Sequence, residues 1–178
     1  MNKKTIKKLF IIAGVILLLA GAILAIWLYQ STTKNDDTNT DTTTGTITET
    51  IDAVVETRTA VNEANGVEEG LRVYDSAIKS ASSDTAVTLN VNKSLYASSK
   101  GSLDAAVTAA DEAIAKSDGK DNQAYFAAGV AYEKKGDYSK ALENYKKALE
   151  AFNNDTSRTN TSSGAYYQEK ITLMEGKL

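Results

Sequence analysis

The sequence predicts an all-α protein, in which an array of helical hairpins follows a single apolar helix. Two observations lead to this prediction. From residue 47 onward a pattern of small and apolar residues recurs about every 35 residues, with its members three and four residues apart, as on one helix face. Nearer the N-terminus, 21 consecutive residues carry no charged side chain, which is the length of a membrane-spanning helix.

The N-terminal segment is predicted to anchor the chain in a membrane. Residues 1–8 contain four lysines and no acidic residue, and the apolar run Leu9–Tyr29 follows them. A helix of this length would be ~31 Å long, close to the ~30 Å hydrocarbon core of a bilayer. Because positively charged flanks stay on the cytoplasmic side, we expect a cytoplasmic N-terminus, a transmembrane anchor at 9–29 and an extracytoplasmic C-terminal domain.

A cleaved signal peptide is the alternative interpretation of this segment. Ala20-Gly21-Ala22 fits the pattern of small residues at a cleavage site. Cleavage there would leave the apolar stretch Ile23–Tyr29 at the new N-terminus, and the run exceeds the ~7–15 residues of a usual signal core. The anchor is therefore favoured, and the cleaved form remains open.

Residues 30–46 are predicted to form a flexible, threonine-rich linker. Threonine is the commonest residue in this stretch, which has no large apolar residue. Such a composition cannot bury enough surface to offset the entropy lost on ordering. A flexible linker of this length would span ~22 Å on average.

The helical domain is predicted to occupy residues 47–178 and to begin with two units. The first, 47–80, turns at Asn65-Gly66. The second has a clear second helix, Leu103–Lys116. Its first helix is ambiguous, because Val87, Leu89 and Val91 alternate with the period of a strand, so the register near 87–100 stays open.

The third unit, Asn122–Asp155, has the clearest pattern. Its first helix places Tyr125, Ala128, Gly129 and Tyr132 on one face, and Gly136 then interrupts the periodicity, as a glycine beyond a helix end does. The second helix repeats small and apolar residues at the same spacing: Tyr138, Ala141, Leu142, Tyr145, Ala148 and Leu149. A last helix, 165–177, is expected to cover the open end of the array.

The third unit resembles a tetratricopeptide repeat (TPR). The family's glycine and small residue are matched by Gly129 and Ala141, and its turn by Gly136 and Tyr138, whereas Asn153 stands where the family usually has proline. The resemblance extends over about 47–178, and it implies three units and a capping helix. It is specific in the third unit and weaker in the other two.

The resemblance also implies a candidate site. Repeats of this family bind protein segments on a concave surface lined by the first helix of each unit, which corresponds here to Val55, Thr59, Val91, Leu95, Phe126 and Val130. Because these side chains are mostly apolar, we expect an apolar or amphipathic protein segment as the partner, and not a clamped carboxylate. The alternative is that they pack between neighbouring first helices, or lie under the linker or the last helix.

Several classes of function are not expected. The chain has no histidine and no cysteine, which removes triad, thiol and Cys/His zinc chemistry. We therefore expect no catalytic residue, no cofactor, no metal and no small-molecule substrate. The acidic balance after residue 30 argues against nucleic-acid binding.

These features together predict a non-enzymatic adaptor. We expect it to be anchored in a bacterial cell membrane and to bring proteins together on the outer face, in secretion, folding or envelope assembly. The alternative is a structural subunit packed permanently in a larger membrane or surface complex.

Overall fold

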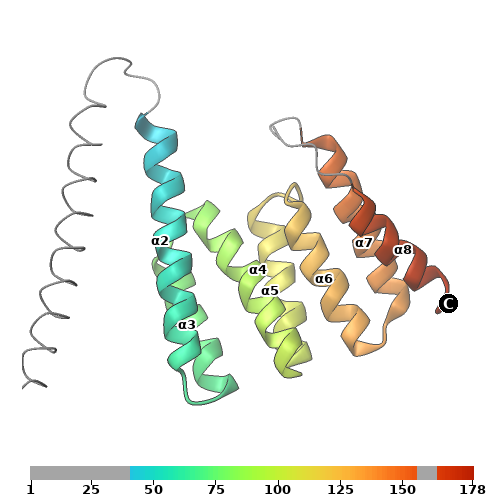
Figure 1. Cartoon of the computed structure of the whole chain (residues 1–178), viewed down its shortest axis with the longest axis horizontal. Coiled ribbons are helices and arrows are strands. Elements are labelled where there is room, and N and C mark those ends of the chain that lie inside the picture. The colour runs from blue at the N-terminus through green and yellow to red at the C-terminus, as the bar shows by residue number, and fades with distance from the viewer. Residues whose placement is uncertain (1–40, 156–163) are drawn as a thin grey trace, which may run out of the picture. The chain divides into compact units, whose positions relative to one another are not determined.

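The computed structural model describes residues 41–155 and 164–178, and every element in these ranges is a helix or a turn (Figure 1). The predicted basic N-terminus 1–8 and anchor 9–29 lie outside the described residues. The chain divides into residues 1–44 and a compact unit, Gly45–Leu178. The helices are α2 (Asp41–Glu63), α3 (Val67–Ser80), α4 (Ser83–Lys100), α5 (Leu103–Lys116), α6 (Asn122–Lys135), α7 (Tyr138–Asn154) and α8 (Ala165–Glu175).

The helices form three hairpins, α2–α3, α4–α5 and α6–α7, and α8 follows the third. Figure 1 shows them side by side in chain order. Each hairpin packs on the next one: α3 contacts α4, and α6 contacts both α4 and α5. Helix α8 packs on α7. The predicted array of three units with a capping helix is therefore the observed architecture of the described chain.

Helix α2 begins earlier than the sequence predicts. Residues 41–46, assigned above to the flexible linker, are the first turns of this helix. The compact unit begins at Gly45, two residues before the predicted start of the domain. The linker was predicted because these residues bury little apolar surface, but a helix already formed downstream can extend into such residues.

Helix α4 is continuous, so the strand-like interpretation of Val87, Leu89 and Val91 is wrong. All three side chains are buried. Neighbouring helices pack around α4 on several sides, and buried residues consequently fall on more than one helix face, which hides the helical period. The register does not shift: Ser94 Oγ donates to the Ala106 carbonyl at 2.8 Å, and these residues lie 35 positions before Gly129 and Ala141.

The hairpin turns depend on glycine and on side-chain caps. Gly101 and Gly136 end α4 and α6 with φ of 81° and 79°, a left-handed conformation that glycine adopts without steric cost. The predicted role of Gly136 is thus confirmed. Asp121 and Asp137 begin the helices that follow, since their carboxylates accept hydrogen bonds from the amides of Ala124 and Lys140.

The interfaces between hairpins are built largely from alanine. The α4–α5–α6 core joins the half-buried Leu95 to small, fully buried side chains, and a second cluster continues it toward α3. Small side chains allow the helix axes to approach closely. The fully buried alanines of α5 and α6 are Ala106, Ala109, Ala110, Ala113, Ala124, Ala127 and Ala131.

Asn90 is an exception in this apolar core. Its side chain is fully buried, and neither Oδ1 nor Nδ2 has a hydrogen-bond partner in the described part of the chain. Leaving a buried amide unpaired costs about 1–3 kcal/mol. The position 35 residues later is Tyr125, a largely apolar side chain.

We therefore expect Asn90→Leu to stabilise the protein by about 1–3 kcal/mol, measured by urea unfolding. The matched control is Asn62→Leu on the exposed surface of α2, which should change stability by only a few tenths of a kcal/mol, roughly the difference in helix propensity. A loss of stability in Asn90→Leu would show that the amide is satisfied in solution or that leucine overfills the site.

Candidate protein-binding surface

Two of the six predicted site residues lie on an open surface. Val55 and Thr59 are exposed and one turn apart on α2. Thr59 Oγ1 donates to the Val55 carbonyl at 2.9 Å, so this hydroxyl is partly engaged by its own helix. The pair is free to contact another molecule.

The pair on α4 is covered by the neighbouring hairpins. Val91 is buried in the core with alanines of α5 and α6, and the half-buried Leu95 packs against the same cluster. The prediction that Val91 lines an open surface is wrong, because the next first helix, α6, packs over it.

The pair on α6 lies under helix α8. Phe126 and Val130 are half-buried against a cluster that contains Ile171 and Met174. The Phe126 ring centroid lies 5.7 Å from Tyr145, 5.4 Å from Tyr166 and 6.0 Å from Tyr167. Phe126 and Val130 therefore have packing partners within the chain. A role for Phe126 in binding another protein stays a prediction.

Helix α8 is also held by a polar contact beside these rings. Tyr145 Oη donates to Glu133 Oε2 at 2.6 Å, and Lys170 Nζ donates to the same oxygen at 2.9 Å. Burial alone would raise the pKa of Glu133, but the hydrogen bonds from Tyr145 and Lys170 outweigh burial and lower that pKa. Glu133 thus joins α6, α7 and α8 through one carboxylate.

This contact predicts a pH-dependent stability. A carboxylate whose pKa is lower in the folded state stabilises that state above its unfolded pKa, near 4.5, and the contribution is lost as the pH falls through the folded value. We expect the wild type to be more stable than Glu133→Gln at pH 7, and the difference in melting temperature to shrink below about pH 4.5. Glu150→Gln, an exposed acid on α7, is the control; a Glu133→Gln difference independent of pH would contradict the ionic role.

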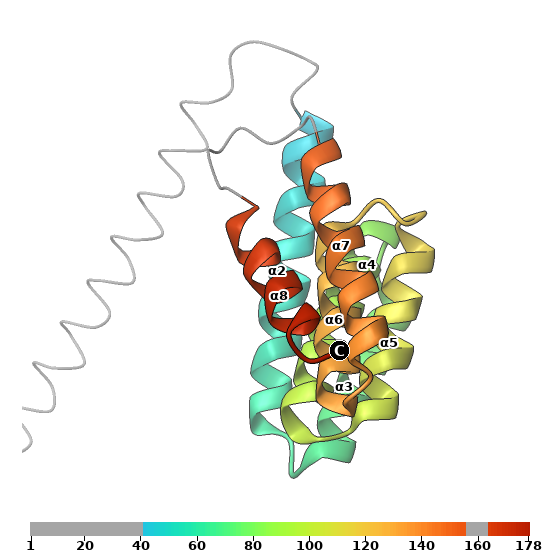
Figure 2. The same ribbon diagram turned by 90° about the vertical axis from the view of Figure 1, so that its right-hand side faces the viewer.

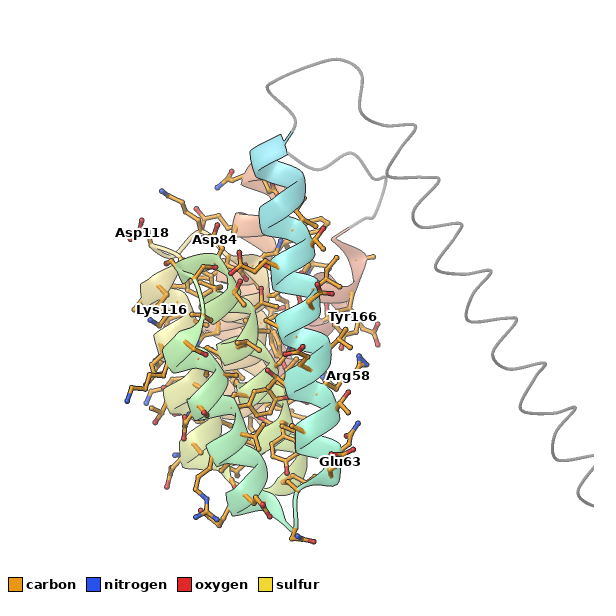
Figure 3. The ribbon with its side chains drawn as sticks, turned by 90° about the vertical axis from the view of Figure 1, so that its left-hand side faces the viewer. Arg58, Glu63, Asp84, Lys116, Asp118 and Tyr166 are labelled. Atoms are coloured by element: carbon orange, nitrogen blue, oxygen red, sulfur yellow. The ribbon has the colours of Figure 1, made fainter. Side chains whose placement is uncertain are left out.

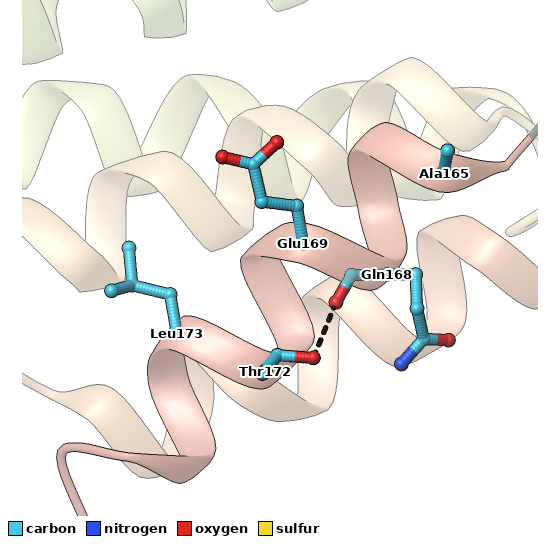
Figure 4. Close-up of a pocket in the computed structure, with 5 residues that line it drawn as sticks. All are labelled: Ala165, Gln168, Glu169, Thr172 and Leu173. Atoms are coloured by element: carbon cyan, nitrogen blue, oxygen red, sulfur yellow. Dashed lines mark hydrogen bonds between the residues drawn. The ribbon is translucent and has the colours of Figure 1, made fainter.

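The outer face of α8 is a shallow, mainly apolar depression of about 540 Å³. Figure 4 shows that Glu169 and Leu173 point to the same side of the helix there. Thr172 Oγ1 donates to the Gln168 backbone carbonyl at 3.0 Å, as the dashed line in Figure 4 marks.

Two exposed isoleucines of α2, Ile47 and Ile51, were not among the predicted site residues. Ile47 and Ile51 precede Val55 at four-residue steps on α2, and all three are exposed. The four-residue spacing was a detectable signal of a shared helix face, but the candidate site was taken from family position, which gave only Val55 and Thr59 on this helix. Tyr166 is exposed on α8, on the same side of the domain as Arg58 and Glu63 of α2 (Figure 3). Helices α2 and α8 lie on one side of the array in Figure 2.

No group of three or more acidic residues gathers in the described part of the chain in a way that would hold a metal ion. Likewise, none of the helices from α2 to α8 combines the length and hydropathy needed to cross a bilayer.

Comparison with known proteins adds one match. Residues 123–155 match the family model of the tetratricopeptide repeat, and this segment is the α6–α7 hairpin with the following residue. The comparison with curated proteins gave no match. A matched repeat inside an array of similar hairpins supports a TPR-like protein, and such a repeat indicates protein–protein interaction.

Proposed function

We propose that the protein is a membrane-anchored adaptor whose TPR-like domain binds segments of other proteins outside the cytoplasm. The match of residues 123–155 to a repeat that mediates protein interaction is the observation on which this proposal rests. The exposed apolar side chains of α2 and α8 support it, because they offer surface that the described chain leaves uncovered.

Membrane attachment rests on the sequence of the N-terminal segment. The apolar run 9–29, preceded by four lysines, has the composition of a transmembrane helix with its N-terminus in the cytoplasm. Placed there, the adaptor would work in secretion, folding or envelope assembly in a bacterial cell.

The orientation gives a direct prediction. Protease added to spheroplasts should digest residues 45–178 and leave a membrane-embedded fragment, seen with antibodies against each end of the chain. A cytoplasmic protein serves as the control for intact membranes. A protected domain would contradict the orientation, and a mature N-terminus at Ile23 would show a cleaved signal instead.

Crosslinking in intact cells followed by mass spectrometry tests the adaptor role itself. An adaptor should give crosslinks from the helical domain to other envelope proteins, and mild detergent with salt should release those proteins. Stoichiometric co-purification under the same conditions would favour the alternative, a structural subunit. A domain that crosslinks to no other protein would overturn both.

A further inference from the structure

Helix α8 packs on the rest of the domain in the way that a bound helix would. Its buried side chains, Tyr167, Ile171 and Met174, follow one another at steps of four and three residues and therefore lie on one face. The other residues of the helix are exposed, apart from the half-buried Lys170. Amphipathic helices that bind to apolar surfaces are anchored by residues at this spacing.

Helices α6 and α7 together form the surface that receives these anchors. We call it the α8-binding face, and it consists of Phe126 and Val130 on α6 and Tyr145 and Phe152 on α7. The Tyr167 ring centroid lies 6.0 Å from that of Phe126 and 5.2 Å from that of Phe152. The two aliphatic anchors of α8 pack in the cluster around Tyr145.

Polar contacts fix the position of α8 along this face. Lys170 Nζ donates to Glu133 Oε2 at 2.9 Å, and Gln123 Nε2 donates to Tyr167 Oη at 3.0 Å. The face therefore recognises a definite pattern in the helix that occupies it. The pattern has an aromatic anchor, a cation three residues later, and aliphatic anchors four and seven residues after the aromatic one.

Helix α8 covers this face less firmly than a hairpin would. It has 11 residues, and isolated helices below about 12–15 residues are marginal, so its helicity depends on this packing. The ion pair of Lys146 with Glu175 joins side chains that are 55% and 51% exposed, and such pairs contribute little stability. Phe126 stays half-buried under α8, whereas Val91, at the equivalent position, is buried under α6.

We propose that α8 is an internal ligand, which a helix of another protein displaces from the α8-binding face. The incoming helix would carry the pattern of α8, with its aromatic anchor on Phe126 and Phe152 and its cation on Glu133. The inference rests on the proposed function, because it requires a protein partner. It adds the sequence pattern of that partner and a contact that keeps the site covered until the partner arrives.

Competition between the two helices makes the inference measurable. Helix α8 belongs to the same chain, so it acts as an intramolecular ligand, whose effective concentration can reach roughly the millimolar range. A free peptide with the sequence of α8 should therefore bind the wild type poorly. It should bind much more tightly once the anchors of α8 itself are removed.

The first experiment uses the full-length protein and a fluorescent peptide of residues 164–178. Ile171→Asp with Met174→Asp should release α8 without altering the α8-binding face, since both residues lie on α8. We expect this variant to bind the peptide at least tenfold more tightly than the wild type, measured by fluorescence anisotropy. Leu173→Asp, on the exposed side of α8, is the matched control and should behave as the wild type does. A peptide that carries the same two aspartates should bind neither protein.

A released variant that keeps α6 and α7 folded, as hydrogen exchange would show, but binds the peptide no better than the wild type would overturn the inference. If that variant does not fold, a reversible bridge decides. The chain has no cysteine, so Lys146→Cys with Glu175→Cys places two unique thiols on α7 and α8. Closing them with a cleavable bis-maleimide should lower peptide binding at least tenfold, and cleavage should restore it. Equal binding before and after cleavage would overturn the inference.

The natural occupant can be identified in living cells with a photo-crosslinking phenylalanine analogue at position 126 of the full-length chain. We expect two products: α8 of the same chain, and a segment of another protein that carries the pattern. Crosslinked dimers through α8 of a second copy, without a product of the second kind, would overturn the inference. If position 126 labels only its own α8 while other parts of the domain crosslink to partners, the inference fails and the proposed function stands. If no part of the domain crosslinks to another protein, both fail.

Discussion

Gly129→Leu is expected to lower the free energy of unfolding by about 3 kcal/mol. A Cβ placed on Gly129 would lie 2.5 Å from Cε1 and 2.6 Å from Cδ1 of Tyr145, on the second helix of the same hairpin. The Tyr145 ring is fully buried and its hydroxyl is hydrogen-bonded to Glu133, so the ring has no free space into which it can move. Thermal and urea unfolding followed by circular dichroism would measure the loss.

A matched pair of glycine-to-alanine substitutions separates the clash with Tyr145 from the effect of replacing a glycine in a helix. Gly129→Ala should destabilise the protein, although alanine is the better helix former. Gly45→Ala, also within a helix, meets no atom within 4 Å and should be neutral or slightly stabilising. If both substitutions behave alike, α6 and α7 do not approach as closely as described.

Phe126→Ala is expected to have an effect of similar size, a loss of about 3 kcal/mol. Three tyrosine rings surround Phe126, two of them on α8, so its truncation leaves a cavity between α6 and α8. The lower stability should appear in urea unfolding. Proteolysis within residues 156–178 should also be faster, because α8 loses part of the surface on which it packs.

Tyr166→Ala provides the comparison. Tyr166 lies in the same ring cluster but is 54% exposed, so its truncation should cost only about 1 kcal/mol. Capture of crosslinked partners should be measured for both variants under conditions where each is folded. If the Phe126→Ala protein has normal stability but captures no partner protein, Phe126 contributes to binding, as the family resemblance predicts.

The third hairpin could be predicted residue by residue because its sequence is locally consistent. Gly129 at the close approach and Gly136 at the turn each require a residue without a side chain, and their spacing shows where the two helices meet. The sequence of α4 is less informative. Asn90 and Ser94 are polar yet fully buried, and hydrophobic periodicity cannot reveal a polar side chain in the core.

The candidate site was only partly predictable, for a different reason. Family position placed these residues on the first helix of each hairpin, but their exposure depends on what packs over each helix. Val91 and Phe126 occupy equivalent positions and are covered by α6 and α8, whereas the hairpin after α2–α3 packs mainly against α3 and leaves Val55 open. The order of packing along the array, and not the residue type, decides which of these positions faces solvent.

The packing order also determines how the domain responds to force. The main packing contacts of the described helices join helices that are at most two apart along the chain. When the C-terminal end is held, a pull on the N-terminal end of α2 would therefore be carried by one interface after another, and the weakest interface would open first. The domain would extend in a series of small steps, one hairpin at a time, and could lengthen under tension while its C-terminal hairpin remains folded.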